Sequence, residues 1–217
     1  MAVILRIKSQ SGLVMKLDIP IIGILRGILP DFFAEVMTAA FEAGLQVIEV
    51  TFNTARAEEI ITTHRPHVPE GKLLGMGTIR NLDEARKAVD AGAMFLVTPN
   101  VDRAVIEYAA SRDIPVIVGA MTPTEVYTAW SAGANMVKVF PCTMFGPQHI
   151  RDLLGPFESI PLVAVGGVNS SNVNAYFEAG AAAVGVGTSL FGQKALADRK
   201  PREIVRNVRQ FLSLIHQ

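Results

Sequence analysis

A single lysine, Lys138, interrupts an apolar run over residues 136–140, and a proline follows the run at position 141. Short β-branched and aromatic runs are typical of buried strands, where lysine is seldom found without a chemical reason. Burial disfavours the ammonium form, so we expect a lowered pKa for Lys138 and a free amine able to attack a ketone. Two other interpretations stay open: an ammonium that extends to solvent at the strand end, or one that binds a phosphate.

A second charged residue, Glu49, lies in another apolar run, over residues 47–52, where an unpaired carboxylate is costly. Thr51 and Asn53 follow at a spacing of two, which places the three side chains on one face of a strand. Burial would raise the pKa of Glu49 into the range of a general acid or base. The alternative is a buried ion pair with Lys138 that only stabilises the fold.

The elements that must position these residues repeat along the chain. Eight apolar runs alternate with amphipathic stretches; they cover residues 21–25, 47–52, 73–76, 95–98, 116–118, 136–140, 162–165 and 183–186. Runs of this kind, without strict alternation, are typical of parallel strands covered by helices. One strand–helix unit in roughly every twenty residues, repeated eight times, predicts a single-domain (β/α)8 TIM barrel over residues 20–217.

Helix ends support this repeat. Four predicted helices end in the dipeptide Ala-Gly, at residues 43–44, 91–92, 132–133 and 179–180. Glycine just past a helix accepts the left-handed conformation that turns the chain into the next strand. We also expect a helix over residues 82–91 with Asn81 as its N-cap, a closing helix over residues 201–216, and an arm or short helix over residues 1–19.

Composition excludes several classes of partner. The 20 basic residues balance the 20 acidic ones, and no basic run is present, which argues against nucleic acid and anionic membranes and favours a small-molecule partner. The single cysteine, Cys142, excludes a disulfide within the chain and suits a reducing compartment. No apolar run approaches a signal peptide or a membrane span, so we expect a soluble cytoplasmic protein.

Active sites of (β/α)8 barrels lie at the C-terminal ends of the strands. Glu49 and Lys138 belong to the second and sixth runs, which face each other across such a barrel, so we expect them to approach at its mouth. Arg26 ends the first run, where its guanidinium could bind a carboxylate or phosphate, or pair with a neighbouring acid. Small or hydroxyl-bearing residues that let a ligand approach the backbone follow runs three to five: Gly77-Thr78, Thr98-Pro99-Asn100 and Gly119.

The last two runs end in glycine pairs, Gly166-Gly167 and Gly185 with Gly187, the second followed by Thr188. Loops in these two places frequently bind phosphate, because glycine lets backbone N–H groups converge on an anion. The Thr188 hydroxyl adds a donor, and the pattern predicts a phosphate-bearing ligand.

No metal site is predicted. The four histidines, His64, His67, His149 and His216, fall in or beside predicted helices and not at strand ends. Cys142 lies close to the predicted site, but no histidine is placed to activate it, so we interpret it as having no catalytic role.

Between residues 21 and 190, several motifs follow the order found in the 2-keto-3-deoxy-6-phosphogluconate (KDPG) aldolase family, which the chain resembles. They are Ile-Glu-Val-Thr at 48–51, Gly-Thr at 77–78, Val-Thr-Pro at 97–99, Met-Thr-Pro-Thr-Glu at 121–125, Lys-Val-Phe-Pro at 138–141, Gly-Pro-Phe at 155–157 and Gly-Gly at 166–167. The resemblance implies a class I aldolase, usually a homotrimer, that forms a Schiff base and needs no cofactor. Members cleave 2-keto-3-deoxy-6-phospho sugar acids to pyruvate and glyceraldehyde 3-phosphate, and some cleave 4-hydroxy-2-oxoglutarate to pyruvate and glyoxylate.

The same resemblance implies roles for individual residues. Lys138 matches the Schiff-base lysine and Glu49 the general acid/base. The other matches are Thr78 and Pro99 around the pyruvate moiety, Phe140 in the pocket wall, and Gly166, Gly167 and Thr188 in the phosphate site.

Two departures affect the substrate prediction. Asn53 stands where the gluconate-type enzymes have an arginine that holds the pyruvate carboxylate, and Val165 stands where they have a threonine. Both resemble the 2-keto-3-deoxy-6-phosphogalactonate branch, as do residues 24–28 and 145–148, whereas residues 121–123 and 155–157 resemble the gluconate enzymes. The preferred C4 epimer therefore stays open, and we expect Arg26 to take part in binding the carboxylate. The alternatives are a phosphate-binding barrel isomerase or synthase without a Schiff base, and a barrel that only binds sugar acids.

Overall fold

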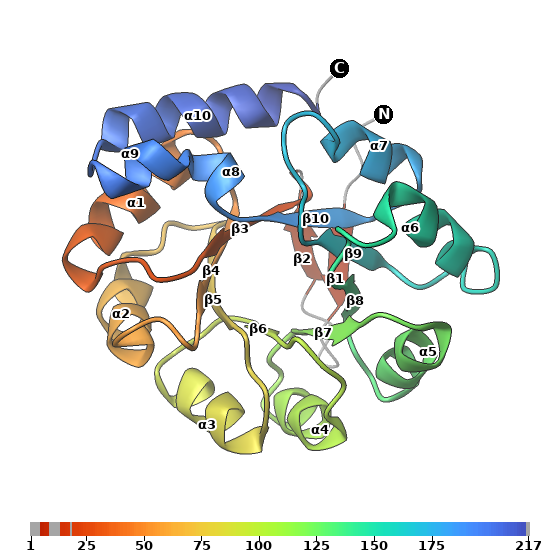
Figure 1. The fold of residues 1–217 in the computed structure, drawn as a ribbon. Helices are drawn as coiled ribbons and strands as arrows, with labels where there is room; N and C mark the ends of the chain where they lie inside the picture. Colours follow the sequence, from red (N-terminus) through yellow and green to blue (C-terminus); the bar gives the residue numbers. More distant parts are fainter. Residues whose placement is uncertain (1–4, 9–13, 18, 216–217) are drawn as a thin grey trace.

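A computed structural model describes residues 5–8, 14–17 and 19–215 (Figure 1). Eight parallel strands close into a barrel in the order β10-β3-β4-β5-β6-β7-β8-β9, which confirms the (β/α)8 fold. Each strand overlaps one of the predicted apolar runs: β3 (Ile21–Leu25), β4 (Val47–Thr51), β5 (Leu73–Gly77), β6 (Leu96–Val97), β7 (Val116–Ala120), β8 (Met136–Val139), β9 (Leu162–Val165) and β10 (Ala183–Val186).

Helices surround the barrel as an outer ring, and α10 lies across the outside of α1 (Figure 1). The helices are α1 (Pro30–Glu42), α2 (Ala57–His64), η1 (Arg65–His67), α3 (Leu82–Asp90), α4 (Arg103–Ser111), α5 (Pro123–Ser131), α6 (Gly146–Leu154), α7 (Val173–Glu178), α8 (Thr188–Phe191), α9 (Gln193–Ala197) and α10 (Pro201–Ser213). Asn81 is the N-cap of α3, as predicted, because its side chain accepts a hydrogen bond of 3.0 Å from the Glu84 backbone N–H. The four Ala-Gly glycines that end helices all have positive φ angles, between 97° and 107°.

The N-terminal segment differs from one of its two predicted forms. Residues Leu5–Lys8 (β1) and Val14–Leu17 (β2) form an antiparallel hairpin and not a short helix. Apolar and polar residues alternate in Leu5-Arg6-Ile7-Lys8, which is the two-residue period of a strand and not the 3.6-residue period of a helix. The rest of the segment, apart from residues 19 and 20, lies outside the described residues, as do residues 216 and 217 beyond α10.

Two apolar clusters hold the fold together. The larger fills the space between the strands and the helices, and the smaller fills the inside of the barrel. Phe95 belongs to the inner cluster and is 1% exposed. Gly75 makes room for it, since a methyl group at Gly75 would lie within 2.6 Å of the Phe95 ring. The barrel interior is therefore a packed core below the site, as expected for eight strands.

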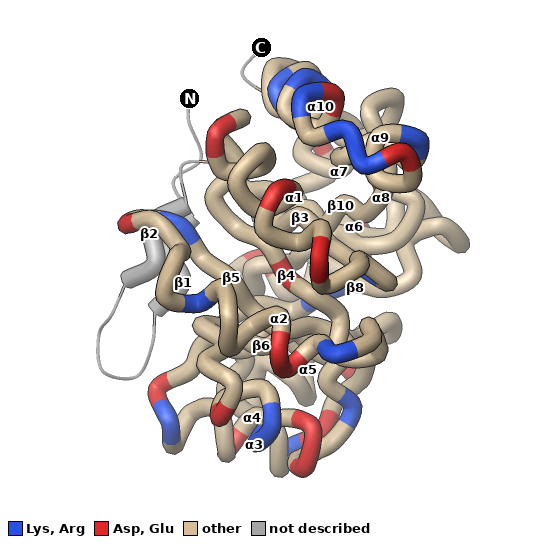
Figure 2. Tube along the Cα trace, turned by 90° about the vertical axis from the view of Figure 1, so that its left-hand side faces the viewer, with Lys and Arg blue, Asp and Glu red and all other residues tan. Residues whose placement is uncertain are grey.

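Charged residues lie mainly on the outer helices. Figure 2 shows acidic and basic segments mixed over these helices, in keeping with the zero formal net charge. Across the described part of the chain, no helix combines the length and the apolar character that a membrane crossing requires.

Because Phe95 fills the barrel interior, Phe95→Ala should lower the free energy of unfolding by about 3–5 kcal/mol. The matched control is Phe145→Ala, whose ring is 57% exposed and should cost less than about 1 kcal/mol. Urea denaturation of the two variants and the wild type measures both values. Equal losses for the two variants would contradict the packed interior.

Candidate active site

Glu49 and Lys138 lie on opposite strands of the barrel, β4 and β8, and line the same cavity of about 370 Å³. Both are buried, with 2% and 6% of their surface exposed. Among the ion pairs of the described residues, none joins the two side chains directly. The structure therefore brings the two residues together at the barrel mouth, as predicted, without the direct ion pair of the purely structural interpretation.

Burial shifts both groups toward their neutral forms. It raises the pKa of the Glu49 carboxyl, and the positive charges of Lys138 and Arg26 oppose this shift. It lowers the pKa of the Lys138 ammonium; the charge of Glu49 opposes this shift and the charge of Arg26 adds to it. The Lys138 Nζ also lies 4.9 Å from the centre of the Phe140 ring. The pair thus supplies an amine nearer to its nucleophilic form and a carboxyl group nearer to the range of proton transfer.

Glycine creates the room for the buried carboxylate. Gly77 of β5 pairs with Thr51 of β4, two residues after Glu49. A methyl group at Gly77 would lie 2.6 Å from the Glu49 Cδ. Real Cβ atoms do not approach another atom so closely, so an alanine here would displace the carboxyl group. The sequence marked Gly77 as a position that lets a ligand approach, but the structure shows that it first accommodates Glu49.

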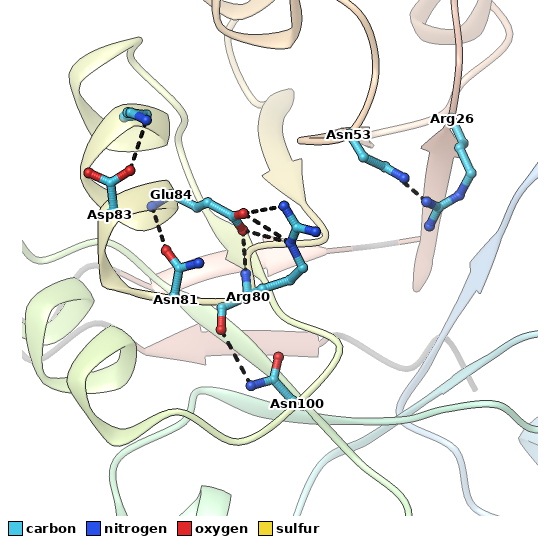
Figure 3. A network of polar contacts seen from close by, with 8 residues as sticks. Arg26, Asn53, Arg80, Asn81, Asp83, Glu84 and Asn100 are labelled. Atoms are coloured by element: carbon cyan, nitrogen blue, oxygen red, sulfur yellow. Dashed lines mark hydrogen bonds and ion pairs between the residues drawn. The ribbon is translucent and has the colours of Figure 1, made fainter.

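Arg26 enters the same cavity from the end of β3 and binds two neutral side chains. Its Nη1 donates to Asn53 Oδ1 at 2.9 Å, and its Nη2 donates to Thr78 Oγ1 at 3.3 Å. Figure 3 shows Arg26 and Asn53 pointing toward one another from neighbouring strands. A guanidinium held by neutral partners keeps its charge available for an anion.

Buried hydroxyl groups fix the two strand ends that carry Arg26 and Asn53. The Thr54 hydroxyl accepts a hydrogen bond of 2.9 Å from the Gly27 backbone N–H and lies 3.0 Å from the Thr51 hydroxyl. The sequence placed Thr51 on the strand face that it shares with Glu49 and Asn53, and the Thr51 hydroxyl makes this internal contact. Thr54 carried no sequence signal, because its role depends on a contact with Gly27, which lies 27 positions earlier in the chain.

Thr78 has an unusual backbone conformation, with φ at +60°. A β-branched residue rarely adopts this left-handed region, which costs about 1–3 kcal/mol. The following loop is braced, since Glu84 accepts hydrogen bonds from the Arg80 backbone at 2.7 Å and from its guanidinium (Figure 3). Glu84 is 6% exposed, so its buried carboxylate anchors the Arg80 backbone in the loop that presents the Thr78 hydroxyl to Arg26.

The segments after β9 and β10 form another part of the cavity wall, beside the end of β3. Predicted residues Gly166, Gly167 and Thr188 line it, together with Phe140 and Arg26. Seven further lining residues lie outside the predicted set of site residues: Ile24, Val165, Val168, Asn169, Gly185, Gly187 and Ser189. Gly185, Gly187 and Ser189 belong to or adjoin a motif that the sequence did mark, whereas Val168 and Asn169 follow the glycine pair and had no signal of their own.

Asn53, Thr78 and Pro99 do not line this cavity directly. Asn53 and Thr78 reach it through Arg26. The Thr98-Pro99 backbone packs against Gly119 of β7, where a methyl group would lie 2.6 Å from the Thr98 carbonyl oxygen. The Thr98 hydroxyl also accepts a hydrogen bond of 3.0 Å from the Gly119 backbone N–H. Pro99 is therefore held against Gly119 of β7, and Gly119 in turn pairs with Lys138 of β8.

Other candidate groups are engaged elsewhere. Burial raises the pKa of the Cys142 thiol to about 11, and the thiol donates to the Val139 carbonyl at 3.2 Å. His149 bonds the Met121 carbonyl oxygen at 2.8 Å and packs on Phe145. Among the described residues, no three His, Cys, Asp or Glu side chains cluster closely enough to hold a metal ion. The groups available for chemistry are therefore the amine, the carboxyl group and the guanidinium.

Comparison with known proteins decides the family. Residues 18–207 match the family model described as KDPG and KHG aldolase. The chain belongs to the KDPG and KHG aldolase family. It is 32% identical to the 2-dehydro-3-deoxy-6-phosphogalactonate aldolase of Escherichia coli (strain K12), over 89% of this chain and 95% of the relative.

Solved structures of the family share the fold. "Native KDPGal structure" superimposes with a TM-score of 0.85 at 31% identity and covers 92% of this chain and 96% of its own. A KDPG aldolase of Legionella pneumophila, with pyruvate captured as a covalent carbinolamine, superimposes with a TM-score of 0.83 at 25% identity, over 89% and 94% of the two chains. The aldolase resemblance seen in the motifs is thus confirmed, and the chain is an aldolase, a carbon–carbon lyase.

The charges around Lys138 predict opposite effects of two substitutions. Glu49→Gln removes a negative charge that raises the pKa of Lys138, so this pKa should fall. Arg26→Gln removes a positive charge that lowers the pKa of Lys138, so this pKa should rise. The pH dependence of reductive methylation of Lys138, followed by peptide mass spectrometry, measures both shifts. Lys87, an exposed lysine paired with Asp83, serves as the internal reference. Shifts in the same direction would contradict the assigned geometry.

Proposed function

We propose that this chain is a class I aldolase that cleaves 2-keto-3-deoxy-6-phosphogluconate, or its galactonate epimer, to pyruvate and glyceraldehyde 3-phosphate. The observation that carries the proposal is a buried lysine with a lowered pKa opposite a buried carboxyl group in one cavity. The carbinolamine of pyruvate in the Legionella relative supports imine chemistry. The relatives named galactonate and gluconate aldolases support both epimers as substrates.

The roles of the residues follow from their chemistry. The neutral amine of Lys138 attacks the C2 ketone to form a carbinolamine. The Glu49 carboxyl group donates a proton to the carbinolamine hydroxyl, which leaves as water and gives a protonated imine and the Glu49 carboxylate. Glu49 accepts the proton of the C4 hydroxyl, directly or through a water molecule, as the C3–C4 bond breaks. The bond electrons move into the imine, which becomes an enamine, and the aldehyde leaves. Glu49 then returns this proton to C3. Water hydrolyses the protonated imine, which releases pyruvate and the free amine, and the remaining proton returns to Glu49. No metal or other cofactor takes part in this sequence.

Binding of the two ends of the substrate is divided between two sides of the cavity. Arg26, supported by Asn53 and Thr78, binds the carboxylate end. The loops with Gly166, Gly167 and Thr188 bind the phosphate, and Phe140 and Pro99 enclose the reacting carbons. Contacts at the far end of the substrate orient the C3–C4 bond and so contribute to the rate. The same site without its phosphate contacts suits cleavage of 4-hydroxy-2-oxoglutarate to pyruvate and glyoxylate.

We further propose a homotrimer, as the family resemblance implies, and a cytoplasmic location.

Borohydride trapping with pyruvate tests the imine. We expect a reduced pyruvate adduct on Lys138, identified by peptide mass spectrometry, and comparison of kcat/KM for the two epimers then gives the preferred substrate. Lys138→Arg should lose the adduct and at least about 10³-fold in turnover. Glu49→Gln should keep the adduct and lose about 10²–10⁴-fold, because only proton transfer is removed. An adduct on another lysine, or turnover by Lys138→Arg, would instead favour a barrel enzyme without a Schiff base.

Arg26→Ala tests the carboxylate contact. In the condensation direction we expect the KM for pyruvate to rise about tenfold or more, because a charged hydrogen-bond donor to the carboxylate is lost. Arg56→Ala is the matched control, since Arg56 is exposed, pairs with Glu59 and does not line the cavity. An unchanged KM for pyruvate in Arg26→Ala would show that another group binds the carboxylate.

A further inference from the structure

The backbone after β9 is tied down by two asparagine side chains. The Gly167 carbonyl oxygen accepts one hydrogen bond from Asn169 Nδ2, at 3.1 Å, and another from Asn172 Nδ2, at 3.0 Å. A carbonyl oxygen has two lone pairs, so both of its acceptor positions are occupied. Asn172 is the N-cap of α7 and, unlike Asn169, does not line the cavity.

Each asparagine is itself fixed in orientation. The Asn172 Oδ1 accepts from the Asn169 backbone N–H at 2.8 Å. The Asn169 Oδ1 accepts from the Ser171 backbone N–H at 2.8 Å and from the Ser171 hydroxyl at 2.6 Å. Because the amide oxygens meet backbone donors, the NH2 groups must face Gly167. The two asparagines therefore form a rigid clamp on one carbonyl group.

The next carbonyl, that of Val168, is held by a residue of α8. Ser189, which follows β10, donates its hydroxyl hydrogen to the Val168 carbonyl oxygen at 3.0 Å. In contrast, no acceptor among the described residues takes a hydrogen bond from the backbone N–H groups of Gly167 or Val168, and both residues line the cavity. Within the described part of the chain, Gly167 and Val168 thus have their carbonyl groups engaged and their N–H groups free.

The clamp determines where one of these N–H groups points. In a trans peptide the C=O of one residue and the N–H of the next point in opposite directions. Fixing the Gly167 carbonyl therefore also fixes the Val168 N–H on the other side of that peptide. Gly166 and Gly167 have φ angles of +97° and +77°, and glycine has little preference for the sign of φ, so side chains must decide the orientation. A reversed peptide would turn a carbonyl oxygen, with its partial negative charge, toward a bound phosphate.

We propose that Asn169 and Asn172 are positioning residues for the phosphate end of the substrate: by binding the Gly167 carbonyl, they hold the Val168 N–H in the orientation that donates to a phosphate oxygen. The inference rests on the proposed function in one respect, that the ligand bears a phosphate. Neither asparagine needs to touch the substrate.

The first test is the dissociation constant of inorganic phosphate, measured by isothermal titration calorimetry, because it does not depend on aldol chemistry. Asn172→Ser keeps an N-cap residue for α7 but is too short to reach Gly167. We expect Asn172→Ser and Asn169→Ser each to raise the dissociation constant about fivefold, and the double variant to raise it about 25-fold. Each substitution removes about one hydrogen bond that holds the Gly167 carbonyl. Asn135→Ser is the matched control: Asn135 accepts from the Val116 backbone N–H at 2.7 Å, just before β8, and its variant should bind phosphate like the wild type.

A kinetic comparison separates positioning from general damage. In condensation with pyruvate, the variants should raise the KM for glyceraldehyde 3-phosphate by the same factors and leave unchanged both the KM for pyruvate and the rate with unphosphorylated glyceraldehyde. Phosphate binding within twofold of the wild type in the folded double variant, or no phosphate binding by the wild type, would overturn the clamp. Failure of the wild type to form a pyruvate adduct on Lys138 would overturn the aldolase proposal alone, because the calorimetric result decides the clamp independently.

Discussion

Desolvation of two ionisable groups inside one barrel is the constraint on which the site depends. Glu49 and Lys138 are both buried, and burial outweighs their mutual attraction in setting the direction of each pKa. A direct ion pair would stabilise the charged forms and oppose both shifts. The rest of the architecture maintains the separation: opposite strands set the distance between the backbones, and Gly77 gives the carboxyl group a place beside β5.

Sequence reasoning succeeded where the physical signal is local. The strands were predictable because apolar runs and helix-ending glycines are written in consecutive residues, and Lys138 and Glu49 stood out as charges inside such runs. The order of strands in a barrel then placed the two residues opposite each other. The hairpin of β1 and β2 also had a local signal, the alternation of apolar and polar residues in β1. The prediction of a short helix overlooked this alternation.

Contacts between distant loops were beyond the sequence. The bond from Arg26 to Asn53 joins residues 27 positions apart, and the bond from Ser189 of α8 to the Val168 carbonyl joins residues 21 positions apart. The Asn169 and Asn172 contacts depend on the positive φ angles of a glycine pair, which no periodicity reveals. Thr78 is similar, because its strained backbone is tolerated only where neighbouring contacts fix it. Residue types at strand ends can therefore indicate a site, whereas the orientation of each side chain and backbone N–H group depends on tertiary contacts.

The neutral partners of Arg26 have a consequence for the encounter with ligands. Asn53 and Thr78 accept its hydrogen bonds without cancelling its charge, so an exposed guanidinium remains at the mouth of a molecule whose formal net charge is zero. A local positive potential over low-dielectric walls attracts anions over several ångströms, and dissolved salt screens it within about 10 Å at 0.1 M. The arrival rate of an anion at this cavity is therefore coupled to ionic strength, even though the protein as a whole has no net charge to attract it.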